Sequence, residues 1–212
     1  GYWTFDWETK AHLTAKEIAV IRPQIAAIKD QSKRESAFLK LQTKVEYHNQ
    51  RDNQSIALQT DIDNNSSWLK SGMTIGDIMC NLTSLSMAFE TLGISKEDFM
   101  SAYEKKYKVN LTETQKAMQF EDFLEYVRRQ KCISTYRGSS DAWNFMAEIV
   151  GVTQDKKDWG TSLRKSDKEK EISDAFKSGK AVIASLYTGK GHIVRFQSIG
   201  DDGITIDDPY GK

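Results

Sequence analysis

The first quarter of the chain combines an aromatic segment with a helical pattern. Residues 1–9 (GYWTFDWET) carry four aromatic side chains with alternating character and predict an extended segment. Thr14, followed three residues later by Glu17, matches a capping box, and helical spacing of apolar residues continues to about residue 43. Pro23 falls inside this pattern, where proline kinks or breaks a helix. We therefore predict an α-helical arm over residues 1–44.

The middle of the chain predicts loops and then a series of helices. Residues 45–65 are polar and irregular, with HNQRDNQ and TDIDNNSS as loop signals. Residues 79–92 have the spacing of a mostly buried helix that ends at Gly93. Further helices are expected at four places: after Ser95, over 112–132, over SSDAWNFMAEIVG, and from about Ser166.

The last part of the chain changes character. KAVIASLY and HIVRFQSI are rich in β-branched residues, and GITIDD follows the turn residues 200–203. This pattern predicts an antiparallel hairpin. Helices followed by strands, without βαβ alternation, indicate an α+β fold. We divide the chain into the arm at 1–44 and a domain at 45–212.

Composition narrows the function classes. The 212 residues are 39% hydrophobic and 28% charged, and 30 basic residues balance 30 acidic ones. Nucleic-acid and membrane-surface binders usually carry surplus basic charge, so neither partner is expected. No apolar run approaches the roughly 20 residues of a membrane span, and no signal-peptide pattern opens the chain. Because the chain begins at Gly1 and stops at Lys212, we expect a processed or trimmed product.

Few residues are available for metal or disulfide chemistry. Two cysteines and three histidines lack the spacing of a zinc site, and a disulfide scaffold would need more cysteines. Asp61, Asp63 and Asn65 match the start of a calcium loop, but Ser66 and Gly72 occupy positions that require Gly and Glu. We therefore expect a solvated polar loop there, with no metal or cofactor.

One combination of residues predicts thiol chemistry. Cys80 begins its helix, where free amides and the helix dipole favour a thiolate. His192 begins a strand after the segment Gly-Lys-Gly, and Asp208 ends the neighbouring strand 16 residues later. Antiparallel pairing brings such residues together, as a Cys-His-Asp triad requires. Asp207 remains a rival to Asp208, because adjacent strand residues point to opposite faces.

Each of these signals also has an ordinary structural interpretation. A cysteine flanked by Met and Leu is usually a small buried hydrophobe, a histidine at a strand start is usually a surface residue, and Asp-Asp-Pro-Tyr-Gly is first of all a turn. Their joint occurrence in this order favours the catalytic interpretation. Cys132, at the end of a charged helix, and His48, which lacks a strand and carboxylate context, are set aside.

Two stretches resemble a known family. GHIVRFQSIGDDGITIDDPYGK is similar to the C-terminal signature of the bacteriocin-leader-processing peptidases and their papain-like relatives, and CNLTSLSMAFETLGIS resembles their nucleophile helix. The resemblance covers roughly 45–211. It implies Cys80 as nucleophile, His192 as base and Asp208 as orienting residue. By the same resemblance Gln50, in YHNQRDN, would be the oxyanion-hole donor.

The chain departs from the family at three points. Gln50 and Cys80 are 30 residues apart, a longer gap than is typical of the family, so either an insertion or a different glutamine is involved. Asn81 stands where relatives usually have glycine, and the chain ends where relatives usually continue with further strand.

The resemblance implies a papain-like cysteine peptidase that hydrolyses peptide or peptidoglycan-peptide amide bonds through a thioester. Acyl transfer uses the same residues. The main alternative is a catalytically decayed or self-processing papain-like module that acts as a binding or structural part of a larger bacterial or phage assembly. A secreted, cell-envelope or virion-associated setting fits these relatives better than the cytoplasm. The aromatic arm would either pack on the hydrolase domain, anchor an assembly, or border the cleft and restrain activity.

Overall fold

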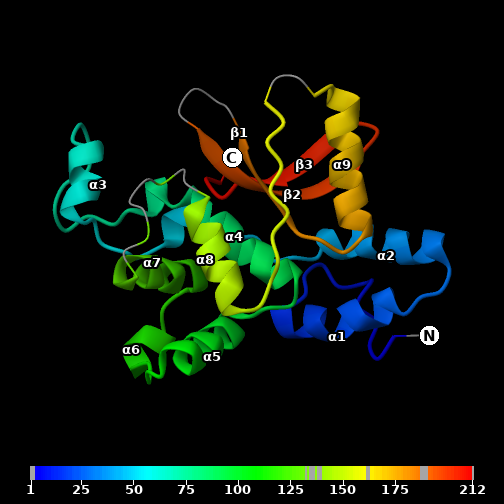
Figure 1. Ribbon diagram of the computed structural model, residues 1–212, viewed down its shortest axis with the longest axis horizontal. Coiled ribbons are helices and arrows are strands. Elements are labelled where there is room, and N and C mark those ends of the chain that lie inside the picture. The colour runs from blue at the N-terminus through cyan, green and yellow to red at the C-terminus, as the bar shows by residue number, and fades with distance from the viewer. Residues whose placement is uncertain are drawn as a thin grey trace.

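The computed structural model describes residues 3–131, 133, 137, 140–160, 163–186 and 191–211. Within these residues the fold is mixed α+β, with helices first and a three-stranded sheet last (Figure 1). The elements are α1 Ala15–Ala26, α2 Gln31–Gln42, η1 Gln50–Asp52, α3 Gln59–Asn64, η2 Gly76–Ile78, α4 Cys80–Thr91, α5 Lys96–Tyr107, α6 Glu113–Lys116, α7 Phe120–Gln130, α8 Asp141–Ile149, α9 Lys165–Lys177, β1 Val182–Leu186, β2 His192–Gly200 and β3 Gly203–Asp207.

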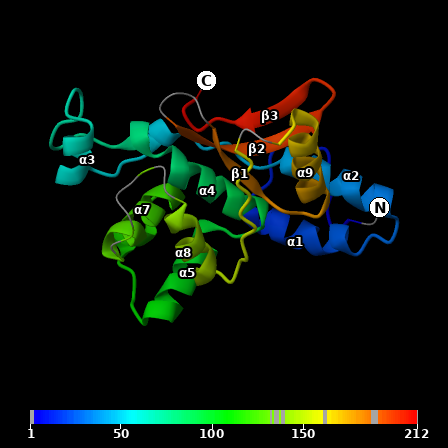
Figure 2. The same cartoon turned by 45° about the horizontal axis from the view of Figure 1, so that its top comes forward.

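The sheet is antiparallel in the order β1-β2-β3, which confirms the predicted hairpin. Val194 and Phe196 of β2 form an apolar cluster with Ile172 and Phe176 of α9, which covers that face of the sheet (Figure 2). Residues of the other parity point away from α9 because side chains alternate along a strand. Arg195 belongs to that set and reaches the backbone of α2.

Two larger apolar clusters meet on α4. One side of α4 packs with α5, α7 and α8 through a group that includes Leu82, Leu85 and Phe89. Met87, on another side of the helix, joins the cluster built by Trp7, α1 and α2. The N-terminal arm therefore shares a core with the helix that begins at Cys80.

The chain between Asn53 and Gly76 leaves the body of the molecule and returns. This segment, residues 54–75, is called here the α3 excursion. Both ribbon views show α3 projecting from one end of the molecule, with α1 and α2 at the other end (Figures 1 and 2). A small apolar cluster of Leu69, Ile75 and Met79 anchors its returning limb.

Three predictions for the first 65 residues were wrong. Pro23 lies inside α1, and the break falls after Ala26, because the buried stripe of Ile18, Ile21 and Ile25 keeps the helix intact around the proline. Residues 45–65 contain η1 and α3 instead of loop alone. The described part of the aromatic segment, residues 3–9, forms bends and turns instead of an extended strand.

The long helix predicted over 112–132 is divided into α6 and α7. Thr112 and Gln115 form a capping box that begins α6. The Lys96 ammonium donates to the carbonyls of Lys116 and Met118, at 3.0 Å each. Free carbonyls at a helix end need such partners, so Lys96 stabilises the break, which periodicity along residues 112–132 does not reveal.

Candidate active site

Cys80 is the first residue of α4 and is partly buried. The preceding residue, Met79, provides no side-chain cap, so the first amides of α4 have no side-chain acceptor there. The short helix η2 leads into Cys80 and packs closely on the segment that contains Gln50. A Cβ atom on Gly76 would lie 2.6 Å from the Gln50 carbonyl oxygen, so this approach requires glycine.

Helix α4 docks against the start of β2 through its first turns. The Ser84 hydroxyl, one turn beyond Cys80 on the same side of the helix, donates to the Ile193 carbonyl at 3.1 Å. The Ile193 amide in turn acts on the Cys80 thiol as a hydrogen-bond partner. The first turns of α4 therefore lie against the start of β2, the strand that begins at His192.

The environment of Cys80 changes its acidity. Burial raises the pKa of the thiol, and the charge of Asp208 acts in the same direction, whereas the amides of Ile193 and Asn81 oppose the increase. The expectation that the helix N-terminus lowers this pKa is therefore wrong for the resting site, because desolvation of the thiolate outweighs the amides. A raised thiol pKa favours the protonated form, so the thiol needs a base to release its proton.

His192 and Asp208 form a close pair. His192 Nε2 lies 2.6 Å from Asp208 Oδ1, and both side chains are about four-fifths buried, with 22% and 20% of their surface exposed. When Nε2 donates to the carboxylate, Nδ1 is the nitrogen with a free lone pair. Nδ1 has no hydrogen-bond partner among the described residues.

The neighbouring Asp207 has a different partner. Asp207 is paired with Arg195 in the β2–β3 register, and its Oδ2 lies 2.6 Å from Arg195 Nη1. Adjacent residues alternate faces, so Asp208 occupies the face of His192, which has the opposite parity to Arg195. Arg195 and His192 therefore each have one aspartate as partner.

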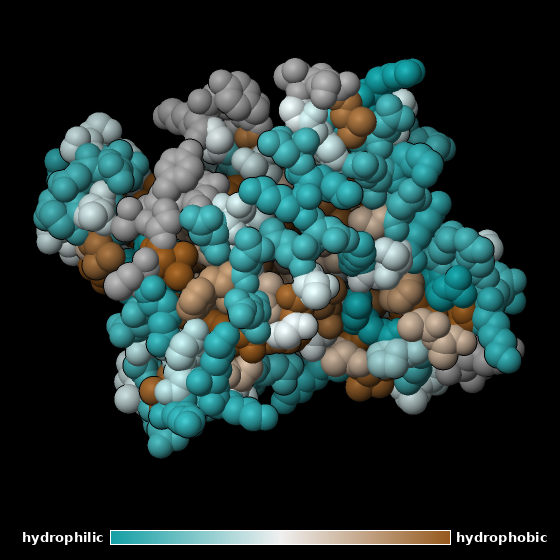
Figure 3. Space-filling model, viewed as in Figure 1, coloured by the Kyte–Doolittle hydropathy of each residue, from teal (hydrophilic) through white to brown (hydrophobic). Residues whose placement is uncertain are grey.

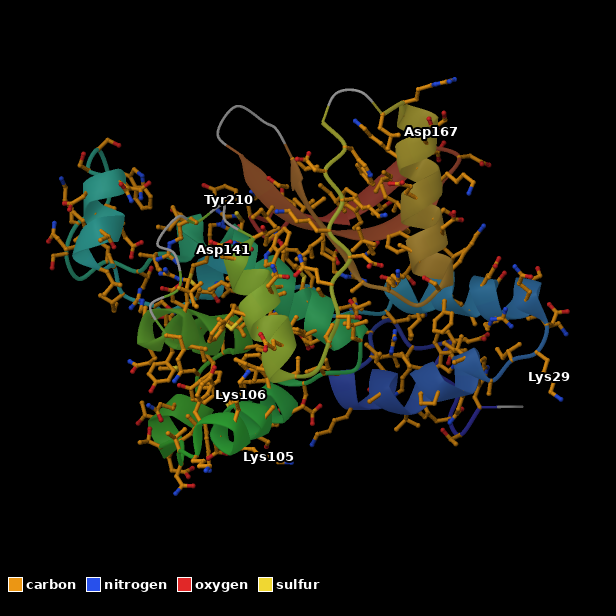
Figure 4. The ribbon with its side chains drawn as sticks, in the orientation of Figure 1. Lys29, Lys105, Lys106, Asp141, Asp167 and Tyr210 are labelled. Carbon is orange, nitrogen blue, oxygen red and sulfur yellow. The ribbon has the colours of Figure 1, made fainter. Side chains whose placement is uncertain are left out.

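The turn after β3 is fastened to the segment before η1. Tyr47 Oη donates to the Asp208 carbonyl at 2.5 Å, and the Gln50 amide donates to the Pro209 carbonyl at 2.7 Å. Tyr210, labelled in Figure 4, lies under the Arg51 guanidinium, 4.9 Å from its ring centroid. These contacts bring Gln50 to the same region as Asp208.

Gln50 is buried and its side chain is already engaged. Its Nε2 donates to the carbonyls of Gly76 and Asp77 at 3.0 and 2.9 Å, and its Oε1 has no partner although it is buried. The α3 excursion explains the long gap to Cys80, because the chain returns to Gln50 before α4 begins. Both amide hydrogens are used, so donation to an oxyanion requires that one of them be released.

The residues that the sequence analysis excluded from the site either have structural partners or lie outside the described part of the chain. His48 lies between Glu90 and Glu121, and Nδ1 is 3.0 Å from Glu121 Oε2. Asp61, from the partial calcium loop, is buried and lies 2.7 Å from Arg137 Nη2, so the expected solvated loop is wrong at this residue. The described residues contain no group of His, Cys, Asp or Glu arranged to hold a metal. Cys132 lies outside the described residues.

Sequence reasoning missed a polar contact beside the thiol. Asn81 Nδ2 donates to the Arg137 carbonyl at 3.1 Å, and the Trp143 indole N–H donates to Asn81 Oδ1. Asn81 therefore connects α4 to α8 and to the chain before it. The only signal in the sequence was that asparagine replaces the glycine usual in the resembled family.

Comparisons with protein families, with curated proteins and with solved structures find no match for this chain. Among the described residues, no helix combines the length and hydropathy needed to cross a bilayer.

Proposed function

We propose that the protein is a papain-like cysteine peptidase in which Cys80 is the nucleophile, His192 the base and Asp208 the residue that orients the histidine. The observation that carries the proposal is the 2.6 Å contact between His192 and Asp208 at the start of β2, the strand on which the first turns of α4 dock through Ser84. A nucleophile, a base and an orienting carboxylate in series are what acyl transfer through a thiol requires.

The arrangement of elements supports the papain-like assignment. A helix that begins at the cysteine docks by its first turns on an antiparallel sheet. The sheet supplies the histidine, and the residue directly after β3 is the aspartate. The N-terminal amides of α4 would stabilise an oxyanion that forms next to the sulfur.

The chemistry follows from these positions. His192 Nδ1 takes the thiol proton as the sulfur bonds to the substrate carbonyl carbon, and the imidazolium then gives that proton to the leaving amine as the C–N bond breaks. Water, deprotonated by the same nitrogen, attacks the thioester, and the C–S bond breaks as the thiolate regains a proton. Asp208 holds Nε2–H throughout and stabilises the imidazolium.

Gln50 is proposed as the side-chain oxyanion donor, together with the Cys80 amide. Its two bonds to the Gly76 and Asp77 carbonyls hold it beside the residues that lead to Cys80. One of these bonds must open to reach the oxyanion, which makes the donor available only when substrate is bound.

Hydrolysis of peptides tests the proposal directly. The chain is incubated with a proteome-derived peptide mixture and, separately, with purified peptidoglycan stem peptides, and new amine termini are identified by mass spectrometry. Cleavage that disappears in Cys80→Ala and in His192→Ala supports the proposal. Alkylation of Cys80 by iodoacetamide at pH 7, located by peptide mapping, should slow in His192→Ala because the thiol loses its base.

A second function is favoured by the raised thiol pKa and by the engagement of Gln50. Both features suit a papain-like module that no longer turns over and instead binds a partner in a larger assembly. Absence of cleavage on both substrate classes, with a Cys80 alkylation rate that His192→Ala does not change, would select this function. Conjugates formed when an amine nucleophile is added would instead indicate acyl transfer.

A further inference from the structure

The base of the α3 excursion is bonded to the helices that surround the thiol. The Gln54 and Ser55 amides donate to the Asp122 carboxylate of α7 at 2.9 and 3.0 Å. Just before them, Asn53 Nδ2 donates to Thr83 Oγ1 of α4 at 3.0 Å. Because Asp122, Asn53 and Thr83 are buried, these bonds fix where the excursion leaves the body.

A buried ion network holds the excursion a second time. Arg137 lies 2.7 Å from Asp61 in α3 and 2.5 Å from Glu125 in α7, and its own carbonyl accepts from Asn81. Surrounding arginines lower the pKa of Glu125 to about 2 although burial opposes this, so the carboxylate stays charged at all ordinary pH values. The excursion is thereby held in a fixed position relative to the residue after Cys80.

The two limbs of the excursion form a short antiparallel ribbon. Ile56 is paired with Thr74, and hydrogen bonds of 2.9 Å flank the pair on both sides, from Ala57 N to Met73 O and from Ile75 N to Ser55 O. In an antiparallel ribbon, a pair flanked in this way directs its own N–H and C=O groups outward.

The outer edges of this ribbon differ. On one edge the Ile56 carbonyl accepts from Arg129 Nη2 at 2.7 Å. On the other edge the backbone N–H and C=O of Thr74 have no hydrogen-bond partner among the described residues, and Thr74 is exposed. An exposed edge of this kind pairs with an extended peptide.

The same excursion carries exposed apolar side chains. Of the eight large hydrophobic residues exposed in the described part of the chain, four lie here: Ile56, Leu58, Trp68 and Met73, with 37–47% of their surface exposed. Ile56 and Leu58 are two residues apart as the chain leaves the ribbon. Brown, hydrophobic atoms are visible beside the projecting α3 region in Figure 3.

We propose that the α3 excursion is a docking site for an extended apolar segment of the substrate polypeptide. The segment pairs with the Thr74 edge, and its side chains extend over the ribbon face that Thr74 shares with Ile56 and Leu58. This inference rests on the proposed function: if Cys80 is the nucleophile, a peptide bound at an edge only six residues before it is within reach of the thiol and is therefore taken as substrate. Six residues span at most about 20 Å, so the apolar segment lies within roughly six residues of the bond that is cleaved.

Peptide binding to the full chain carrying Cys80→Ala tests this docking site without turnover. The probe is a fluorophore-labelled decapeptide of alternating Leu and Ser, and anisotropy gives its Kd. Ile56→Ser combined with Leu58→Ser should raise the Kd at least about tenfold, because buried apolar contacts are lost. Serine at position 58 is a favoured helix N-cap, so α3 should remain folded. Val109→Ser, an exposed apolar residue elsewhere, is the matched control and should leave the Kd unchanged.

Strand pairing is tested by the same probe N-methylated at alternate residues, which should also bind at least about tenfold more weakly. Equal affinity for the double variant and its parent would overturn the docking site. So would a concentration-dependent dimer that the double variant abolishes, because a second copy would then cover this surface. Cleavage by Cys80 without this binding refutes the docking site alone, whereas binding without any cleavage refutes only the proposed function.

Discussion

At the residue scale, Asp207 and Asp208 provide a matched pair of substitutions. Asp208→Asn should keep the fold and lower the hydrolysis rate by roughly 10³–10⁴-fold, because His192 loses the carboxylate that sets its tautomer. Asp207→Asn should instead lower the free energy of unfolding by about 3–5 kcal/mol, because Arg195 is left buried without its counter-ion. Hydrolysis rates and melting curves of both variants check this. If Asp207→Asn abolished hydrolysis and Asp208→Asn left the rate unchanged, Asp207 would be the orienting residue instead.

His48 gives a pH-dependent prediction. Burial by itself would lower its pKa. Glu121 and Glu90 outweigh burial through their hydrogen bonds and their negative charges, and they raise the pKa of His48 to about 10. Since the folded pKa lies above the unfolded value of about 6.5, the stabilisation is complete below pH 6.5 and is lost as the pH rises toward 10.

Urea unfolding of the wild type and of His48→Gln between pH 6 and 10 measures this dependence. At pH 6 the variant should be less stable by about 3–5 kcal/mol, because the buried carboxylate of Glu121 and the partly buried one of Glu90 lose their cation. The difference between the two proteins should shrink as the pH rises. If the difference in unfolding free energy between the two proteins stayed constant from pH 6 to 10, His48 would not titrate as proposed.

At the element scale, the junction between α4 and α1 depends on Gly93. Its φ is +80°, and a Cβ atom there would lie 2.7 Å from Ala19 Cα, so Gly93→Ala adds a steric clash to backbone strain. We expect a loss of about 2–5 kcal/mol. Gly151→Ala has a similar φ of +69° but open space, and should cost only about 1–2 kcal/mol. Chemical denaturation of both variants checks the prediction, and equal losses would contradict the clash.

At the scale of the whole molecule, the N-terminal arm is part of the folded core. Trp7 is fully buried with α1, α2 and Met87 of α4, and Gln42 accepts from the buried guanidinium of Arg195. The described aromatic residues Trp3, Phe5 and Trp7 belong to this cluster, at the opposite end of α4 from Cys80. Of the three roles expected for the arm, the structure therefore shows packing on the domain.

A chain that starts at Val45 should lose its cooperative melt, because Met87 becomes exposed and Arg195 loses its partners on Gln42. Melting temperature and Cys80 alkylation rate are measured together on the full and shortened chains. A lower melting temperature, or the loss of a cooperative melting transition, supports a structural packing role for the arm. An unchanged melt with faster alkylation would show instead that the arm occludes the site.

Local sequence patterns determined most elements and the composition of the candidate site. Capping residues at Thr14 and Ser95, the buried helix after Cys80 and the β2–β3 hairpin depend on neighbours within a few residues, so they can be read from the chain. The chain has only two cysteines and three histidines. The sequence patterns around them were enough to restrict the candidate nucleophile to Cys80 and the candidate base to His192.

Tertiary structure decided what depends on residues far apart in the chain. The strand register assigned Asp208 to His192 and Asp207 to Arg195, and burial raised the thiol pKa that the helix start alone would lower. The return of the α3 excursion placed Gln50 beside the residues before Cys80. Sequence spacing records none of these contacts, because packing and desolvation depend on which distant segments meet and how fully they exclude water.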